Sequence, residues 1–219
     1  MTVSYDGMHP GPFGLGTRGL LGDFLTRRAF FSFHYADIMR VNNVRNAWKL
    51  DEGRAALIDA SLWESKKTES SENLKATIRS GMNGTSVVCV LVGTETWARR
   101  WVRYEIARSD VDEKGLLAVH VNGINHHQRK QPDPLGANPL DHVGVFDPGD
   151  GNVFLMETDG VVWRSYLDYV QPVKWPKYLP RMPRTYVPLS AGAREYDWRS
   201  NGKDLIGSWV DSAATQVGR

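Results

Sequence analysis

The stretch from Ser86 to Ser109 constrains the fold of this chain more than any other. It begins with a continuous apolar run, Val87 to Val92, which ends at a glycine. A short apolar run bounded in this way is typical of a strand that is buried on both faces of a sheet. A polar turn follows, in which Thr94 or Thr96 is expected to cap a helix that starts near Trp97. The stretch therefore predicts one strand–helix unit of an α/β domain.

The predicted helix carries one acidic residue on its apolar side. At about 100° per residue, Trp101 and Ile106 share one broad arc, and Glu105 falls near the middle of that arc. An ionised carboxylate is costly to bury without a partner. Two interpretations stay open: a structural ion pair, or a carboxylate that is held in a dry aromatic pocket and stabilises a developing positive charge. Three arginines are candidate partners for the ion pair: Arg28, Arg79 and Arg108.

The chain around this stretch alternates between strand and helix patterns. Further strands are predicted at 29–33, 55–59 and 116–121, and helices at 41–50 and 72–82. This alternation predicts an α/β fold with a central, mainly parallel sheet and helices on both faces. In such a sheet, ligands bind beyond the carboxyl ends of the strands.

Side chains at the predicted strand ends are therefore candidate binding residues. Asp59 ends the second strand and either bonds ribose hydroxyls or caps the next segment. Trp63 stands in a polar loop, where it either covers a ligand or anchors the packing, and Thr94 follows the third strand. The end of the first strand offers rings that either stack on a ligand or belong to the core. These residues are Phe33, His34 and Tyr35.

Composition divides the chain into three parts. Residues 1–26 are rich in glycine and proline and predict a flexible extension. Residues 27–124 hold the predicted α/β core. Residues 125–219 begin with a loop that is dense in proline and glycine, and a hairpin is predicted from strands at 143–146 and 153–157. This last part is predicted to be a decoration that packs on the core.

Charge and hydropathy exclude several classes of partner. The formal net charge of +2 over 219 residues is too small to favour nucleic acid or an anionic membrane surface. The apolar runs are all shorter than the roughly 18 residues that a membrane span needs. The single cysteine, Cys89, lies inside the apolar strand and is interpreted as a small buried hydrophobe, which fits a reducing cytoplasm.

Two further motifs are discounted on their context. Gly14, Gly16 and Gly19 spell G-x-G-x-x-G, but they precede the first predicted strand, whereas a dinucleotide-binding fingerprint follows a strand. The histidines lack the spacing of a metal site, so no metal is expected. These histidines are His120, His126, His127 and His142.

Four blocks of sequence resemble the TIR-like domains of bacterial Thoeris anti-phage defence. They read RRAFFSFHYAD, ALIDASLWE, SGMNGTSVVCVLVGTETWARRWVRYEIARS and GLLAVHVNGI, in this order. The resemblance covers about residues 27–124 and extends more loosely through the tail. Its most specific feature is W-x-x-x-E in the predicted helix, formed by Trp101 and Glu105.

The resemblance implies a flavodoxin-like TIR fold and an enzyme that acts on NAD⁺. The position of the essential glutamate of catalytic TIR domains matches Glu105, and the tryptophan one turn earlier matches Trp101. The aspartate that ends the second strand matches Asp59, and the turn after the first strand matches residues 33–35. The loop after Asp59, through which TIR domains contact each other, lacks the glycine that many of them have there.

The expected reaction is cleavage of NAD⁺ at the nicotinamide–ribosyl bond. The family implies that the product is a cyclic ADP-ribose-type second messenger, which activates a partner effector protein, and that TIR domains self-associate. NAD⁺ is then the substrate, and no separate cofactor is expected. Two alternatives stay open: a non-catalytic TIR module that recruits partners, and a hydrolase that depletes NAD⁺ and releases linear ADP-ribose.

Overall fold

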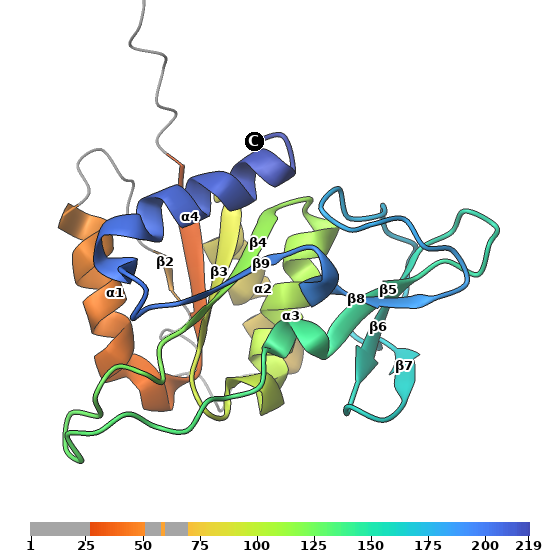
Figure 1. The fold of residues 1–219 in the computed structure, drawn as a ribbon. Helices are drawn as coiled ribbons and strands as arrows, with labels where there is room; N and C mark the ends of the chain where they lie inside the picture. Colours follow the sequence, from red (N-terminus) through yellow and green to blue (C-terminus); the bar gives the residue numbers. More distant parts are fainter. Residues whose placement is uncertain (1–26, 51–57, 60–69) are drawn as a thin grey trace, which may run out of the picture.

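A five-stranded parallel sheet forms the centre of the molecule (Figure 1). The computed structural model describes residues 27–50, 58–59 and 70–219. The strand order is β2-β1-β3-β4-β9, and every neighbouring pair is parallel. The five strands are β1 (Ala29–Phe33), β2 (Ile58–Asp59), β3 (Val87–Val92), β4 (Gly115–His120) and β9 (Arg194–Asp197). The predicted α/β fold with a parallel sheet is confirmed.

Helices cover both faces of this sheet (Figure 1). On one face α1 (Ile38–Leu50) packs against α4 (Gly202–Gln216), and α4 also contacts β3 and β4. On the other face lie α2 (Ser71–Met82) and α3 (Arg100–Val111), joined by a hydrogen bond from Arg79 to Tyr104. The helices predicted at 41–50 and 72–82 are confirmed as α1 and α2.

The central strands are buried on both faces, as their apolar runs predict. All residues of β1, β3 and β4 are buried, including Cys89. Side chains alternate between the two faces of a strand. Phe31 meets Trp48 of α1 edge-on, with 5.4 Å between the ring centroids, and its neighbour Ser32 therefore points to the opposite face, toward α3. Full burial of one such aromatic side chain contributes about 1.5–3 kcal/mol to stability.

β9 is a strand of the parallel sheet, and α4 packs on one face of that sheet. β9 pairs with β4, and α4 approaches the start of β4 so closely that a Cβ on Gly115 would lie 2.5 Å from the carbonyl oxygen of Ala213. The predicted boundary at residue 124 would assign both elements to the decoration. β9 carries no apolar run, because its sequence is Arg-Glu-Tyr-Asp and its first two residues are exposed. The three-part division of the chain stays a prediction, with residues 1–26 outside the described residues.

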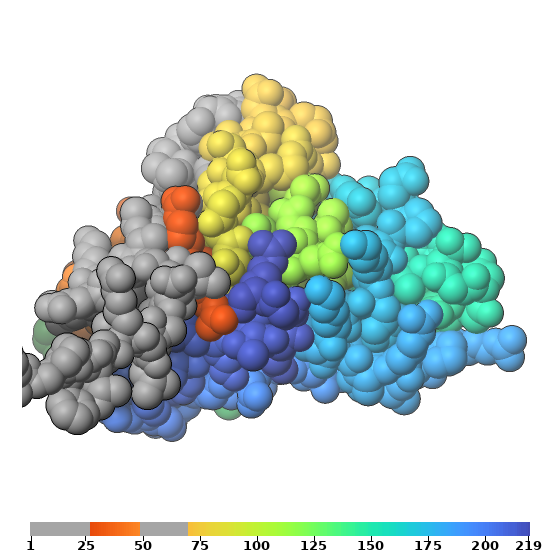
Figure 2. All heavy atoms as spheres, turned by 90° about the horizontal axis from the view of Figure 1, so that it is seen from above, coloured from red at the N-terminus to blue at the C-terminus, as the bar shows by residue number. Residues whose placement is uncertain are grey.

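A second, antiparallel sheet lies to one side of the parallel sheet, next to α3 (Figures 1 and 2). Its strand order is β7-β6-β5-β8. The hairpin predicted from residues 143–146 and 153–157 is confirmed by the pairing of β5 with β6. The bounds are β5 (Val143–Phe146), β6 (Phe154–Thr158), β7 (Trp163–Ser165) and β8 (Tyr186–Pro188).

The helices in the described parts of the chain are too short or too polar to cross a membrane. The G-x-G-x-x-G match at residues 14–19 lies outside the described residues.

Candidate active site around Glu105

The turn between β3 and α3 differs from the predicted cap. A 3-10 turn, Thr96–Ala98, comes first, and α3 begins only at Arg100 without a side-chain cap. The hydroxyl oxygen of Thr96 accepts a hydrogen bond from the backbone N–H of Gly93 (2.9 Å), and Thr94 Oγ1 donates to the carbonyl of Pro134 (2.8 Å). The prediction that Thr94 or Thr96 caps the helix is wrong, because the Thr96 hydroxyl bonds within the turn and the Thr94 hydroxyl bonds the loop that contains Pro134.

Glu105 lies on the face of α3 that packs against the sheet, and its side chain is fully buried. Ser32 of β1 is also fully buried, and its hydroxyl donates a hydrogen bond to Glu105 Oε2. Arg79 instead donates to the hydroxyl oxygen of Tyr104 (3.1 Å). Arg108 pairs with Asp112 (2.5 Å), a residue of its own helix end. Two of the three arginines suggested as ion-pair partners thus bind elsewhere, and the hydroxyl of Ser32 binds the carboxylate of Glu105.

Ser32 is a residue of the candidate site that the sequence analysis missed. It is the one polar residue in the apolar block Ala-Phe-Phe-Ser-Phe of β1. A polar side chain in the middle of a strand that is buried on both faces needs a hydrogen-bond partner. That requirement is a signal that sequence reasoning could have used.

Trp101 lies one turn before Glu105 on α3 and is half-buried. Its ring meets that of Tyr104 edge-on, with 6.1 Å between the centroids. The guanidinium of Arg100 lies 4.8 Å from the centroid of the Trp101 ring, within the range of a cation–π contact. These two contacts fix the orientation of the Trp101 indole on the surface of α3.

The three residues at the end of β1 point in different directions. Phe33 is buried, and the guanidinium of Arg45 in α1 lies 5.4 Å from its ring centroid. Phe33 therefore faces α1, on the side of β1 opposite to Ser32. His34 is half-buried, and its carbonyl accepts the N–H of Asp37 (2.9 Å), whereas Tyr35 is 46% exposed. Their substrate-binding roles stay predictions.

The remaining predicted binding residues are only partly described. The backbone of Asp59 pairs with Phe31 at the end of β2, next to β1, and its side chain lies outside the description. Trp63 lies outside the described residues altogether. Thr94 is half-buried at the carboxyl end of β3, where it binds the loop that contains Pro134.

An ion network, which the sequence did not predict, lies beyond the carboxyl ends of β1 and β4. Arg40 Nη1 lies 2.9 Å from Asp37 Oδ1, and Arg40 Nη2 lies 2.8 Å from Asp133 Oδ2. Arg40 Nε donates to the carbonyl of Ile124 (2.9 Å). Burial raises the pKa of Asp37 above its usual value, although the bonded Arg40 opposes this shift. The network joins the start of α1 to the loop after β4.

Gly93 permits this close assembly. A Cβ on Gly93 would lie 1.9 Å from Asp37 Oδ2, so any side chain there would displace the carboxylate. A Cβ on Gly136 would in turn lie 2.0 Å from the carbonyl oxygen of Gly93. The end of β3 is therefore enclosed between the start of α1 and the 133–136 loop.

Within residues 27–50, 58–59 and 70–219, no three His, Cys, Asp or Glu side chains lie close enough together to hold a metal ion. His126 and His127 stack on each other, with 4.6 Å between their ring centroids. His142 stacks on Trp97 at 4.9 Å. The expectation that the site needs no metal stays a prediction.

Comparison with known proteins identifies the family. The family model of the Thoeris protein ThsB, TIR-like domain, matches residues 30–126. A protein of Bacillus cereus (strain MSX-D12), named putative cyclic ADP-D-ribose synthase ThsB1, is 39% identical over 194 residues, which cover 85% of this chain and 100% of that protein. This chain belongs to the ThsB family of TIR-like proteins.

The ThsB match places the site within the shared domain. The matched residues, 30–126, contain Ser32, Asp37, Trp101 and Glu105. They end before β9 and α4, although both elements are parts of the same sheet layers. The resemblance drawn from four sequence blocks is confirmed, and so is the flavodoxin-like TIR fold that it implied.

Proposed function

We propose that this chain is a TIR-domain enzyme of anti-phage defence that cleaves NAD⁺ at the nicotinamide–ribosyl bond. Its product is a cyclic ADP-ribose-type second messenger that activates a partner effector. The proposal is carried by one observation: a fully buried carboxylate, Glu105, bonded by a buried hydroxyl, Ser32. It is supported by the 39% identity to a protein named putative cyclic ADP-D-ribose synthase.

The chemistry of NAD⁺ suits a lone carboxylate. When the bond between C1′ of the ribose and the nicotinamide nitrogen breaks, its electron pair moves onto the cationic nitrogen, and neutral nicotinamide leaves without a general acid. Positive charge develops at C1′, as in glycoside hydrolysis. A carboxylate in a buried, low-dielectric site stabilises such a charge more strongly than one in water.

Each residue of the site has a role in this scheme. The charge of Glu105 faces the developing cation, and the hydrogen bond from Ser32 fixes the direction of its carboxylate. Trp101 limits the entry of water. A nucleophilic atom in the adenosine part of the same molecule then bonds to C1′ and releases its proton, which closes the ring. In this scheme NAD⁺ is the substrate, and the chain needs no cofactor or metal.

The decisive experiment is Glu105→Gln, which keeps the size of the side chain and removes its charge. We expect nicotinamide release to fall by at least about 10²- to 10³-fold, the range for removal of one transition-state contact. Glu72→Gln, on the exposed start of α2, is the matched control and should leave the rate unchanged. Thermal unfolding of each variant separates loss of chemistry from loss of folding.

Product analysis distinguishes the alternatives. Chromatography that finds only linear ADP-ribose would favour the NAD⁺-depleting hydrolase over the cyclase. Wild-type turnover in Glu105→Gln would rule out the mechanism. A lack of nicotinamide release, even with extract of phage-infected cells, would favour the non-catalytic TIR module. The assay is therefore run with and without such an extract.

A further inference from the structure

The outer side of α3, away from the sheet, borders a groove that the proposed reaction does not use. Three adjoining hollows form this α3 groove, with volumes of about 370, 210 and 720 Å³. The first two share Tyr166 and Asp168, and the last two share Arg79 and Arg108. The groove therefore runs along α3, between α2 and the segment after β7.

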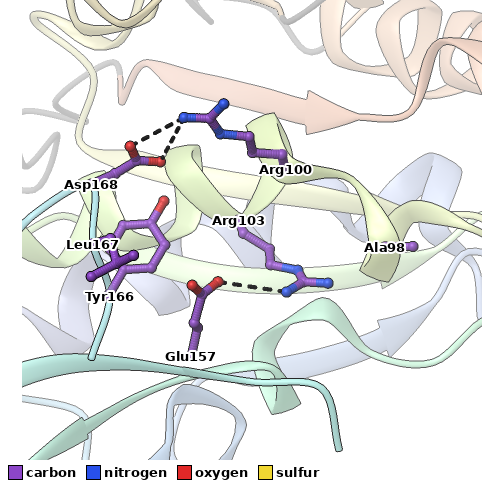
Figure 3. A pocket seen from close by; sticks show the side chains of 7 residues that line it. All are labelled: Ala98, Arg100, Arg103, Glu157, Tyr166, Leu167 and Asp168. Carbon is purple, nitrogen blue, oxygen red and sulfur yellow. Dashed lines mark hydrogen bonds and ion pairs between the residues drawn. The ribbon is translucent and has the colours of Figure 1, made fainter. Parts of the chain in front are cut away.

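The end of the groove near the start of α3 has balanced charge (Figure 3). Arg100 pairs with Asp168, with 3.2 Å between Nη2 and Oδ1, and Arg103 lies 3.6 Å from Glu157. Lys75 also binds Asp168 (2.9 Å) and Glu72 (2.7 Å). Cations and carboxylates match here, so this end has little preference for a charged ligand.

The opposite end of the groove carries excess positive charge. Its lining includes four cations but one carboxylate, Asp112. Two helices, α2 and α3, also end here, and each helix end contributes about half a negative charge. Among the side chains that line this end, cations therefore outnumber carboxylates. The four cations are Arg79, Arg108, Lys114 and Arg219.

Most of these cations bond to neutral oxygens. Arg79 donates to Tyr104, and Lys114 donates to the carbonyl of Thr85 (2.8 Å). Arg219 donates to the carbonyl oxygens of Asp112 and Glu113, at 3.0 and 3.1 Å. Lys114 is 5% exposed, and burial lowers its pKa. An anion in the adjoining hollow would relieve this uncompensated charge.

The middle of the groove is aromatic. Tyr104 and Tyr166 are buried, Tyr169 is half-buried, and all three line the hollow of about 210 Å³. The hydroxyl of Tyr166 has no hydrogen-bond partner within the described residues, although it is buried. A buried hydroxyl without a partner is unfavourable. A ligand that places a nitrogen or oxygen atom within hydrogen-bond distance of it would therefore bind more tightly.

We propose that the α3 groove binds a nucleotide. The phosphates lie at the four cations, and the base lies against the tyrosines, where it bonds the hydroxyl of Tyr166. Arginine side chains suit phosphate geometry, and aromatic rings stack on bases without strong sequence preference. This site is separate from the proposed NAD⁺ site, because the residues that line the groove do not include Ser32, Trp101 or Glu105.

Calorimetric titration of the intact chain with ADP tests the proposal, because ADP has no nicotinamide to release. We expect ADP to bind, and Arg79→Gln and Arg219→Gln each to weaken binding by about ten-fold or more, since each removes one charged hydrogen-bond donor. Arg194→Gln, an exposed residue on β9, removes the same charge elsewhere and should bind ADP as the wild type does. Arg219→Gln keeps the test valid if Arg79→Gln does not fold.

Two further titrations show whether the phosphates and the base of the ligand bind at different ends of the groove. Pyrophosphate should bind more weakly than ADP, and Tyr166→Phe should weaken ADP binding several-fold without affecting pyrophosphate. Glu105→Gln should keep ADP binding, because Glu105 faces the sheet. The proposal is overturned if millimolar ADP does not bind, if both arginine variants bind it like the wild type, or if Glu105→Gln abolishes binding. Equal affinity for pyrophosphate and ADP, with no effect of Tyr166→Phe, would overturn the nucleotide assignment.

Discussion

The two sides of α3 are covered by different parts of the chain. The side toward the sheet packs against β1, β3 and β4 and buries Val102, Glu105 and Ile106. Its one charged group is bonded by the hydroxyl of Ser32. The outer side, which includes Arg100 and Tyr104, meets α2 and the segment after β7. On this side α3 makes ion pairs and ring contacts, and it borders the hollows of the α3 groove.

This difference shows what an amphipathic pattern can reveal. The pattern locates the side of a helix that faces its own sheet, because that side needs apolar residues at helical spacing. It does not reveal a second layer on the opposite side when distant segments supply that layer. Four changes test how differently the two sides behave, beginning with the change expected to cost the most stability.

Ile106→Ala removes a fully buried side chain from the sheet-facing side. We expect the free energy of unfolding to fall by about 2–5 kcal/mol, because a cavity forms in a closed core. Val111→Ala, half-buried on the outer side, is the control and should cost about 1 kcal/mol, because its surroundings are already open to solvent. Urea denaturation measures both, and equal losses would contradict the contrast between the two sides.

Asp110→Asn tests whether the buried carboxyl of Asp110, at the end of α3, is protonated in the folded chain. Burial, with the nearby charge of Glu113, raises the pKa of Asp110 from the ordinary aspartate value of 3.8 to about 8. Between about pH 4 and pH 8 the unfolded chain therefore loses a proton that the folded chain keeps. This lowers the stability of the folded wild type by up to about 1.4 kcal/mol per pH unit as the pH rises.

The Asn variant lacks this loss of stability. Its advantage in the free energy of unfolding should therefore grow with pH, to the order of a few kcal/mol at pH 8. Unfolding measured at several pH values checks this, with the exposed Asp141→Asn as the matched control. A constant difference across the pH range would contradict the buried, protonated state of Asp110.

Ser32→Ala removes the hydroxyl that bonds Glu105. If Glu105 acts as proposed, we expect the rate of nicotinamide release to fall about ten-fold, since one hydrogen bond to a charged group is lost. Ser208→Ala, exposed on α4, is the control. The prediction fails if both variants release nicotinamide at the same rate.

Arg103→Ala should have the smallest effect. Arg103 lies 3.6 Å from Glu157 of β6 and also donates to the carbonyl of Trp97 (3.1 Å). Because partly exposed ion pairs are screened, we expect a loss of about 1 kcal/mol or less. A double-mutant cycle with Glu157→Gln, repeated at high salt, isolates the pair. A coupling well above that value would show that the second sheet is held to α3 more tightly than its contacts suggest.

The sequence predicted those elements that a local pattern reveals, such as an apolar run or helical spacing. The apolar runs of β3 and β4 gave two buried strands, and the position of Glu105 on its helix gave a buried carboxylate. β9 could not be found in this way, because an edge strand needs few apolar residues and its sequence is mostly polar. The helix cap was predicted wrongly because Thr94 and Thr96 bond to the turn and to a distant loop.

The site was predicted only in part, for a related reason. Glu105 and Trp101 lie within one helix, so their spacing reveals them. Ser32 was missed although it is polar in an apolar strand, because its partner lies 73 residues away. The network of Asp37, Arg40 and Asp133 also depends on contacts between distant segments. Such pairings are fixed by tertiary packing and carry no local pattern.

The place of β9 and α4 in the parallel sheet has a consequence for synthesis of the protein on the ribosome. β4 lacks its outer neighbour until β9 is complete at residue 197, and α1 lacks its packing partner until α4 is complete at residue 216. Between the synthesis of β4 and that of α4, the part of the sheet that α4 covers, over β3 and β4, is therefore exposed, a state that favours aggregation. The parallel sheet is complete only once β9 and α4 have been made, so chaperones that bind exposed apolar surface are expected to act on the nascent chain before then.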